Sequence, residues 1–250
     1  TDKSQREKLR KISRAYIHET LSAQLDANLK EVGVSGYTIE NVSQVQDKEG
    51  KWRPIDSDKD PTVILLHYPS ILEDTINYIP PRVKIEISCL SMDEPTELRQ
   101  IRSLIGESFD GEDTDADSLA RTVVPTRTFL EKLFLLAEEF QKEKPRSVRM
   151  SRHLYDLAKL MDTEYGVEAL SNRTLYDAIV EHRKAYYALK YVNYDLHAPS
   201  TINFTIPESV IGAWQDDYTD MKRFFIYGES LEFEALMQKM KELQERVKIL

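Results

Sequence analysis

Thr128-Phe-Leu-Glu-Lys-Leu-Phe-Leu-Leu-Ala137 has the apolar spacing of a helix packed against a core, and a second such stretch, Ser151-Arg-His-Leu-Tyr-Asp-Leu-Ala-Lys-Leu160, follows it. A short basic connection joins the two. Each stretch carries a charged side chain that helical periodicity does not require, Lys132 in the first and Asp156 in the second. These two side chains are therefore candidates for a functional site.

The pattern after these stretches is mainly helical, whereas the pattern before them is mixed. Helices are expected near residues 127–143, 150–162, 173–191, 207–226 and 230–248. Upstream, a helix is expected at 4–30, strands at 37–46, 62–68 and 82–90, and an acidic surface loop at 107–118. The chain is therefore expected to have an α+β fold, with a mixed sheet-and-helix part over residues 1–125 and a helical part over 126–250.

Composition describes an ordinary globular protein. The 250 residues fit one large domain or two modest ones, and 41% of them are hydrophobic and 31% charged. The sequence has no apolar run near the roughly 20 residues that cross a bilayer, and no charged-then-apolar leader. Cys89 is its one cysteine, so no internal disulfide can form. These features predict a cytoplasmic protein that does not bind a membrane.

Charge limits the kinds of partner that the chain can bind. A net charge of −9 argues against broad binding to a nucleic-acid backbone, which needs a dominant positive field. A local basic patch is nevertheless present between residues 142 and 152, where Glu143 is the one acidic residue. Its members are Lys142, Lys144, Arg146, Arg149 and Arg152. Two interpretations stay open for this patch, a solvated loop and helix start or a surface that faces phosphate.

Lys132 lies among apolar neighbours on its helix. The residues at i−3, i+3 and i+4 are Phe129, Leu135 and Leu136. A buried ammonium without a partner is strongly penalised, so Lys132 needs either solvent or an anion. Its stem could reach solvent along the apolar surface, or its head could meet a phosphate or carboxylate in a cleft.

Two carboxylates are the other candidates. Asp156 lies nearly opposite the buried stripe of its helix, where Arg152 and Lys159 offer surface ion pairs. Glu86 lies on an expected strand with Lys84 and Ser88 on its face, and the opposite face is apolar. That face is either a solvated row or a rigid support that directs a carboxylate into a metal site.

Several short motifs follow one another in the order of a known family. Lys84-Ile-Glu86-Ile-Ser88 looks like a strand motif with an acidic residue, Phe129-Leu-Glu131-Lys132-Leu133 like a Glu-Lys-Leu helix start, and Arg152-His-Leu-Tyr155-Asp156-Leu157 like an Arg-Asp-x-Tyr-Asp-Leu motif. Segments 181–184, 217–221 and 230–233 fit as well. With these motifs, most of the chain resembles the AbiEii/AbiGii nucleotidyltransferases, toxin components of bacterial toxin–antitoxin and phage-abortive systems.

The resemblance implies a nucleotidyltransferase-like sheet-and-helix part and a metal-dependent transfer of a nucleotide from an NTP to an acceptor, which could be RNA. It implies Mg²⁺ as cofactor, Glu86 as a catalytic metal ligand, and Lys132 and Arg152 as residues that bind the nucleotide. Asp156 would complete the catalytic set by orienting Lys132 or the acceptor. A cognate antitoxin protein is the implied partner.

The chain departs from the family pattern in two places. His153 stands where the family usually has the first Asp of the Arg-Asp-x-Tyr-Asp-Leu motif. The first family motif, a Gly-Ser turn followed by Asp-x-Asp, has no counterpart before residue 4. We therefore expect the native protein to extend upstream and this chain to be an inactive fragment. The alternative is a non-catalytic module on the same scaffold that binds an antitoxin or another protein.

Overall fold

The computed structural model describes residues 3–47, 49–57, 59–71, 80–89, 96–112 and 117–250. The chain divides into two compact units, Thr1–Ser91 and Met92–Leu250. Strands and helices occur in both, and helices dominate the C-terminal part, so the predicted α+β fold is confirmed. The domain boundary predicted near residue 125 stays a prediction.

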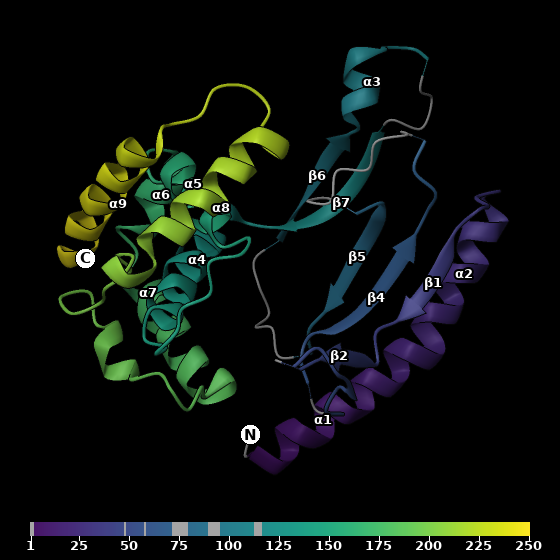
Figure 1. Cartoon of the computed structure of the whole chain (residues 1–250), viewed down its shortest axis with the longest axis horizontal. Coiled ribbons are helices and arrows are strands. Elements are labelled where there is room, and N and C mark those ends of the chain that lie inside the picture. The colour runs from purple at the N-terminus through teal and green to yellow at the C-terminus, as the bar shows by residue number, and fades with distance from the viewer. Residues whose placement is uncertain (1–2, 48, 58, 72–79, 90–95, 113–116) are drawn as a thin grey trace. The chain divides into compact units, whose positions relative to one another are not determined.

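The first unit combines one long helix with a small antiparallel sheet (Figure 1). The helix runs through α1 (Lys3–Tyr16), a π turn η1 (Ile17–Leu21) and α2 (Ser22–Glu31), and it ends before Gly33, whose φ is 81°. The sheet has the order β1-β4-β5, with β1 (Thr38–Asn41), β4 (Thr62–His67) and β5 (Arg82–Ile87). The helix expected at 4–30 and the buried strand at 62–68 are confirmed.

Contacts between the long helix and the sheet region fix this unit. Asn41 donates from Nδ2 to the carbonyl of His18 at 3.1 Å, and Arg14 donates to the carbonyl of Val42 at 3.1 Å. Ile17 and Ile64 are buried in its core. A separate hairpin pairs β2 (Gln44–Gln46) with β3 (Trp52–Pro54). Tyr78 and Ile79, which the sequence places just before the third strand, lie outside the described residues.

The second unit begins with a hairpin that the sequence did not predict. β6 (Thr96–Arg102) pairs antiparallel with β7 (Asp117–Val123), and α3 (Leu104–Ser108) follows β6. The prediction of an acidic surface loop at 107–118 is therefore wrong at its two ends, which belong to α3 and β7. Residues 113–116 of this loop lie outside the described residues. Leu98 and Ile101 are three residues apart and so lie on opposite faces of β6, which breaks the alternation that would identify a strand.

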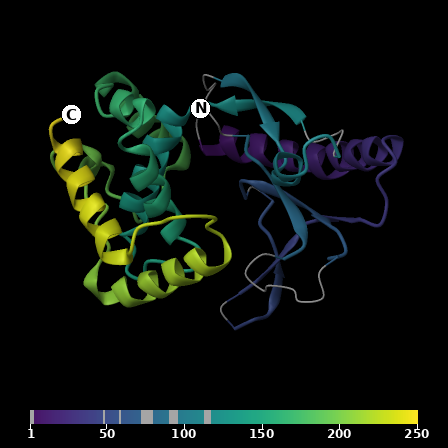
Figure 2. The same ribbon diagram turned by 90° about the horizontal axis from the view of Figure 1, so that it is seen from above.

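Helices α4 to α9 form the rest of this unit (Figures 1 and 2). Their bounds are α4 Pro125–Glu139, α5 Ser151–Leu160, α6 Glu164–Ala169, α7 Arg173–His182, α8 Ile211–Phe224 and α9 Phe233–Lys248. Short turns η2 (Arg183–Tyr187), η3 (Tyr194–His197) and η4 (Glu208–Val210) connect them. Four of the five predicted helices are confirmed to within a few residues. The helix predicted at 173–191 is shorter, because α7 ends at His182 and the π turn η2 continues it only to Tyr187. α6 was missed because it has only six residues.

α4 is the helix on which the others pack. It contacts α5, α6 and α7, and α5 in turn contacts α8 and α9. Pro125 starts α4, where its missing N–H has no helical partner to lose. Phe129, Leu130, Leu133 and Leu136 are completely buried. Burying each such side chain stabilises the fold by about 2 kcal/mol, so α4 contributes strongly to the packing of this unit.

Candidate active site

Lys132 and Asp156 meet across the α4–α5 contact. Nζ of Lys132 lies 2.7 Å from Oδ2 of Asp156, and their side chains are 22% and 35% exposed. The partner of Lys132 is thus a carboxylate at a partly open site, one of the outcomes expected from its apolar surroundings. Asp156 was expected to form surface ion pairs with Arg152 and Lys159, but its partner is Lys132 of α4. Nζ of Lys159 instead lies 5.5 Å from the centroid of the Tyr155 ring.

His153 lies on the same helix, one turn before Asp156. It is 7% exposed, and among the described residues its Nδ1 has no hydrogen-bond partner. Burial, together with the nearby charges of Lys132, Arg152 and Arg146, lowers the pKa of His153 to about 4. The ring is therefore neutral near pH 7, at the position where the family pattern would place a negative charge.

Asp217, on α8, fixes the start of α5. Its carboxylate accepts hydrogen bonds from the backbone N–H of Arg149 and from the backbone N–H of Ser151, the latter at 2.9 Å. The hydroxyl of Ser151 also donates to it, and both Ser151 and Asp217 are buried. A carboxylate at a helix N-terminus satisfies free N–H groups and opposes the helix dipole. This contact sets the position from which Arg152, His153 and Asp156 project.

Arg152 is exposed on the first turn of α5. Its charge acts on the buried ring of His153, as does the charge of Lys132. The positive charges of Lys132 and Arg152 thus both act on the neutral ring of His153. Such an arrangement suits a phosphate, which can take charge-assisted hydrogen bonds from both side chains.

Glu139 changes the interpretation of the basic connection. It is buried at the end of α4 and accepts from Nζ of Lys142 at 2.7 Å and from Nη2 of Arg146 at 2.7 Å. Burial alone would raise the pKa of Glu139, but the hydrogen bonds from Arg146 and Lys142 outweigh it and lower the pKa. Glu143 is the one acidic residue within the window of the five cations, but Glu139, which precedes that window, already binds two of them.

A buried ionic network anchors the opposite side of α4. Arg183 donates to both carboxylate oxygens of Glu138, at 2.7 and 2.5 Å, and also to Glu131. Glu131 accepts from Arg127 as well, at 3.0 Å. Burial would raise the pKa of Glu138, but the hydrogen bonds from Arg183 lower it. Glu131 thus ties α4 to η2, while the next residue, Lys132, faces α5.

The sequence alone does not indicate a role for Glu138, Glu139, Arg183 or Asp217. One signal could have identified part of this set: Arg127, Glu131 and Glu138 recur at helical spacing along α4, on a helix that is otherwise deeply apolar. Charged residues on such a helix need partners. Arg183 and Asp217 lie in segments 181–184 and 217–221 that fit the family motifs, but the motifs do not name their partners, which are 45 and 66 residues away.

Glu86 belongs to the first unit. It lies on β5, opposite Val63 of β4, and its side chain is 50% exposed. Nζ of Lys84 lies 2.8 Å from its Oε1, so the carboxylate already has a cationic partner. The structure therefore brings together Lys132 and Asp156 within the second unit, and Glu86 occupies a separate ion pair.

The described residues include Glu86, the candidate magnesium ligand that the motif indicates. Among them, no group of three His, Cys, Asp or Glu side chains could hold a metal ion. Magnesium is usually bound through carboxylates together with substrate phosphates. Glu86 offers one carboxylate, shared with Lys84. The magnesium requirement stays a prediction.

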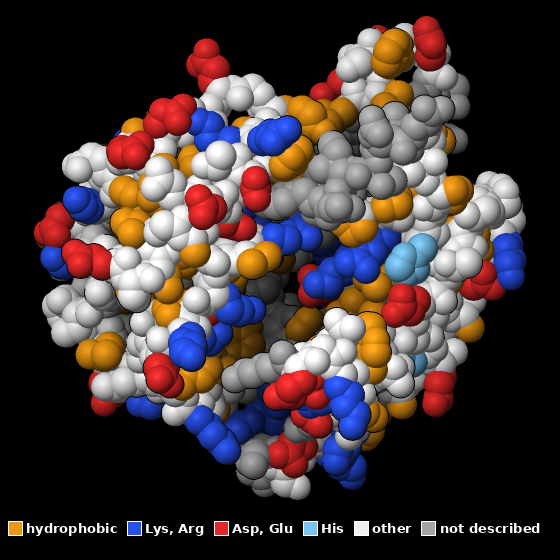
Figure 3. Space-filling model, viewed as in Figure 1, with side chains coloured by type: hydrophobic (Ala, Val, Ile, Leu, Met, Phe, Trp, Pro, Cys, Tyr) orange, Lys and Arg blue, Asp and Glu red, His pale blue; other side chains and the backbone are white. Residues whose placement is uncertain are grey.

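Over the helical unit, acidic and basic side chains are interspersed on the face seen in Figure 3, with no field of one sign. Within the described part of the chain, no helix is long and apolar enough to cross a membrane.

Comparison with known proteins adds one match. The model of a family described as "Nucleotidyl transferase AbiEii toxin, Type IV TA system" matches residues 8–239. This range includes all the motif segments on which the resemblance rests. No curated protein matches the chain, and no solved structure does.

Proposed function

The chain belongs to the AbiEii family of nucleotidyl transferase toxins, and we propose that Lys132 and Arg152 bind the phosphates of its nucleoside triphosphate substrate. Family membership places it among the toxins of type IV toxin–antitoxin systems, which implies a cognate antitoxin. The observation that carries the proposal is the ion pair of Lys132 and Asp156 at 2.7 Å, partly open to solvent.

Nucleotidyl transfer needs positioning and charge neutralisation more than covalent chemistry. The acceptor hydroxyl oxygen attacks the α-phosphorus, the bond from that phosphorus to the bridging oxygen breaks, and pyrophosphate leaves. The hydroxyl proton passes to solvent. Lys132 neutralises charge on the departing phosphates as a compact ammonium, and Arg152 adds a planar donor at the open side.

Asp156 acts on Lys132. In the absence of substrate it holds Nζ in a fixed place, so the ammonium is oriented before a phosphate arrives. Neutral His153 adds no negative charge to compete with the phosphate. Glu86 stays the proposed metal ligand, on the strength of the motif Lys84-Ile-Glu86-Ile-Ser88 alone. RNA stays the proposed acceptor, with the cations of residues 142–152 as its approach surface.

The test uses the full-length protein with labelled NTPs, magnesium and bulk RNA. Lys132→Ala is expected to lower label transfer about 100-fold, since it removes a charge that acts on the transition state. Asp156→Ala is expected to lower it about 10-fold or more, because Lys132 loses its fixed position. Lys159→Ala is the matched control, an exposed lysine on the same helix, and should transfer at the wild-type rate.

Unchanged transfer in both Lys132→Ala and Asp156→Ala would remove these residues from the site. If no NTP supports transfer to any RNA, the non-catalytic interaction module becomes the better account of this scaffold.

A further inference from the structure

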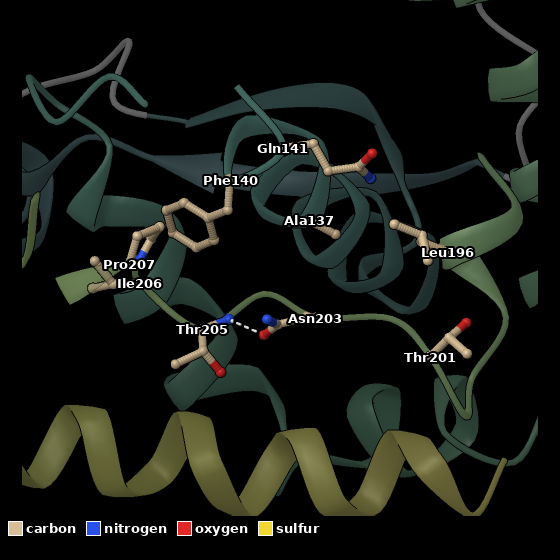
Figure 4. A pocket seen from close by; sticks show the side chains of 9 residues that line it. All are labelled: Ala137, Phe140, Gln141, Leu196, Thr201, Asn203, Thr205, Ile206 and Pro207. Atoms are coloured by element: carbon tan, nitrogen blue, oxygen red, sulfur yellow. Dashed lines mark hydrogen bonds between the residues drawn. The ribbon is translucent and has the colours of Figure 1, made fainter. Parts of the chain in front are cut away.

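A pocket of about 340 Å³ lies at the C-terminal end of α4, apart from the Lys132–Asp156 pair. Its walls are the end of α4, η3 and an extended segment over residues 201–207 (Figure 4). A volume of this size is near the lower end of the range for ligand pockets, enough for one small ring system. None of the nine residues that line it is charged.

The extended segment is held in place by a side chain. Gln244 of α9 donates to the carbonyl of Ile202 at 2.6 Å and accepts from the N–H of Phe204 at 3.3 Å. Ile202 and Phe204 are buried, while Asn203 and Thr205 between and after them are exposed and line the pocket. The segment therefore presents one polar edge to the pocket from a fixed backbone.

An aromatic ring forms the facing wall. Phe140 packs against the buried Trp214, with ring centroids 5.1 Å apart and an angle of 57° between planes. Figure 4 shows the Phe140 ring facing the same space as Asn203 and Thr205. A ring fixed from behind offers a stacking surface, and stacking of a base on an aromatic side chain contributes about 1–3 kcal/mol.

Two amide groups at this pocket have a defined orientation. Oδ1 of Asn203 accepts from the N–H of Thr205 at 2.9 Å, and Oε1 of Gln141 accepts from the N–H of Asn193 at 2.7 Å. Because each oxygen is engaged, each amide has its NH₂ group left to donate. The pocket thus offers hydrogen-bond donors beside an aromatic wall, without a charge.

We propose that this pocket binds an uncharged nucleobase through stacking on Phe140 and hydrogen bonds from the amides of Asn203 and Gln141. Phosphates and carboxylates are poor ligands here, because no cation lines the wall. Recognition of splayed bases by aromatic stacking and edge hydrogen bonds is the usual mode for single-stranded RNA. The source of the base, either the NTP or the RNA acceptor, rests on the proposed function; the binding itself does not.

The experiment measures the binding of uridine, cytidine, adenosine and guanosine to the full-length protein by saturation-transfer NMR titration. At least one nucleoside is expected to bind saturably. Asn203→Asp should lower the affinity for that nucleoside about five-fold or more, since the variant keeps the acceptor for the N–H of Thr205 but loses the NH₂ donor. Phe140→Leu should weaken it further. Phe225→Leu, an exposed phenylalanine outside the pocket, is the control and should bind like wild type.

A thermal melt of each variant separates binding from folding. Asn203 is exposed, so Asn203→Asp is expected to melt like wild type even if Phe140→Leu does not. The proposal is overturned if no nucleoside binds saturably, or if Asn203→Asp binds as tightly as the control. Nucleosides have no phosphate, so a failure here is distinct from a failure at Lys132.

Repeating the titration with NTPs and with a short single-stranded RNA identifies the source. If Asn203→Asp weakens the binding of an NTP, the pocket holds the base of the substrate. If it weakens only the binding of the RNA, the pocket holds a base of the acceptor.

Discussion

His153 shows how a single buried side chain can make stability depend on pH. Its pKa is about 4 in the folded state, below the ordinary value of 6.5, because burial and nearby cations disfavour the charged ring. Between these two values the unfolded chain binds a proton that the folded chain does not. The contribution of His153 is therefore complete above about pH 6.5 and is lost as the pH falls toward 4.

We predict that the free energy of unfolding falls by about 2 kcal/mol between pH 7.5 and pH 5 on account of His153. Urea denaturation at the two pH values measures it. His153→Gln has no titrating ring, so its loss over the same interval should be smaller by that amount. Carboxylates such as Glu138 and Glu139 titrate in both proteins and cancel in the difference. Equal losses in the two proteins would contradict the prediction.

At the scale of elements, α5 depends on a contact from α8. Asp217 accepts from the N–H groups of Arg149 and Ser151, and Arg149 has a φ of 58°, a conformation that few residues other than glycine adopt. Without the carboxylate, the first N–H groups of α5 would be buried and unsatisfied. The orientation of the helix that carries Asp156 is thus set by a residue outside it.

Asp217→Ala is expected to lower the free energy of unfolding by about 2 kcal/mol, because it leaves buried N–H donors without an acceptor. It should also lower nucleotide transfer, since the start of α5 loses its fixed position. Chemical denaturation and the transfer assay measure the two effects. Asp216→Ala, next in the chain but exposed, should leave both near wild type. A loss of the same size in Asp216→Ala would point to helix α8 in general and not to the cap.

Gly166 gives a second example at this scale. A Cβ atom added there would lie 2.3 Å from the carbonyl oxygen of Leu160, which closes α5. α6 can therefore follow α5 closely only because residue 166 has no side chain. The sequence shows the glycine, but it gives no sign of the backbone that approaches it.

For the whole molecule, the sequence predicted what depends on local periodicity. The long helix at 4–30, the strand at 62–68 and the five C-terminal helices follow from the spacing of apolar residues, and Lys132 was identified because it interrupts that spacing. The hairpin of β6 and β7 was missed, since Leu98 and Ile101 break the alternation and its stability comes from pairing between distant segments.

The candidate site, like the fold, could be predicted from the sequence only in part. The motifs brought Lys132 and Asp156 to attention, but their contact joins two helices, and periodicity placed Asp156 on the surface. The partners that orient them are farther still along the chain: Asp217 for α5, and Arg183 for α4. Long-range ion pairs of this kind leave no periodic trace, so only the folded chain identifies them.

One helix connects the two sites in the second unit. Trp214 of α8 supports the Phe140 wall of the pocket, and Asp217, one turn along the same helix, caps α5. A shift of α8 that alters the support of Phe140 therefore also shifts the carboxylate that caps α5. Occupancy of the pocket and of the Lys132 site should then be thermodynamically linked, each ligand changing the affinity for the other by the same factor. Tripolyphosphate titrated with and without a saturating nucleoside measures this factor, and a value of one would mean that α8 transmits nothing.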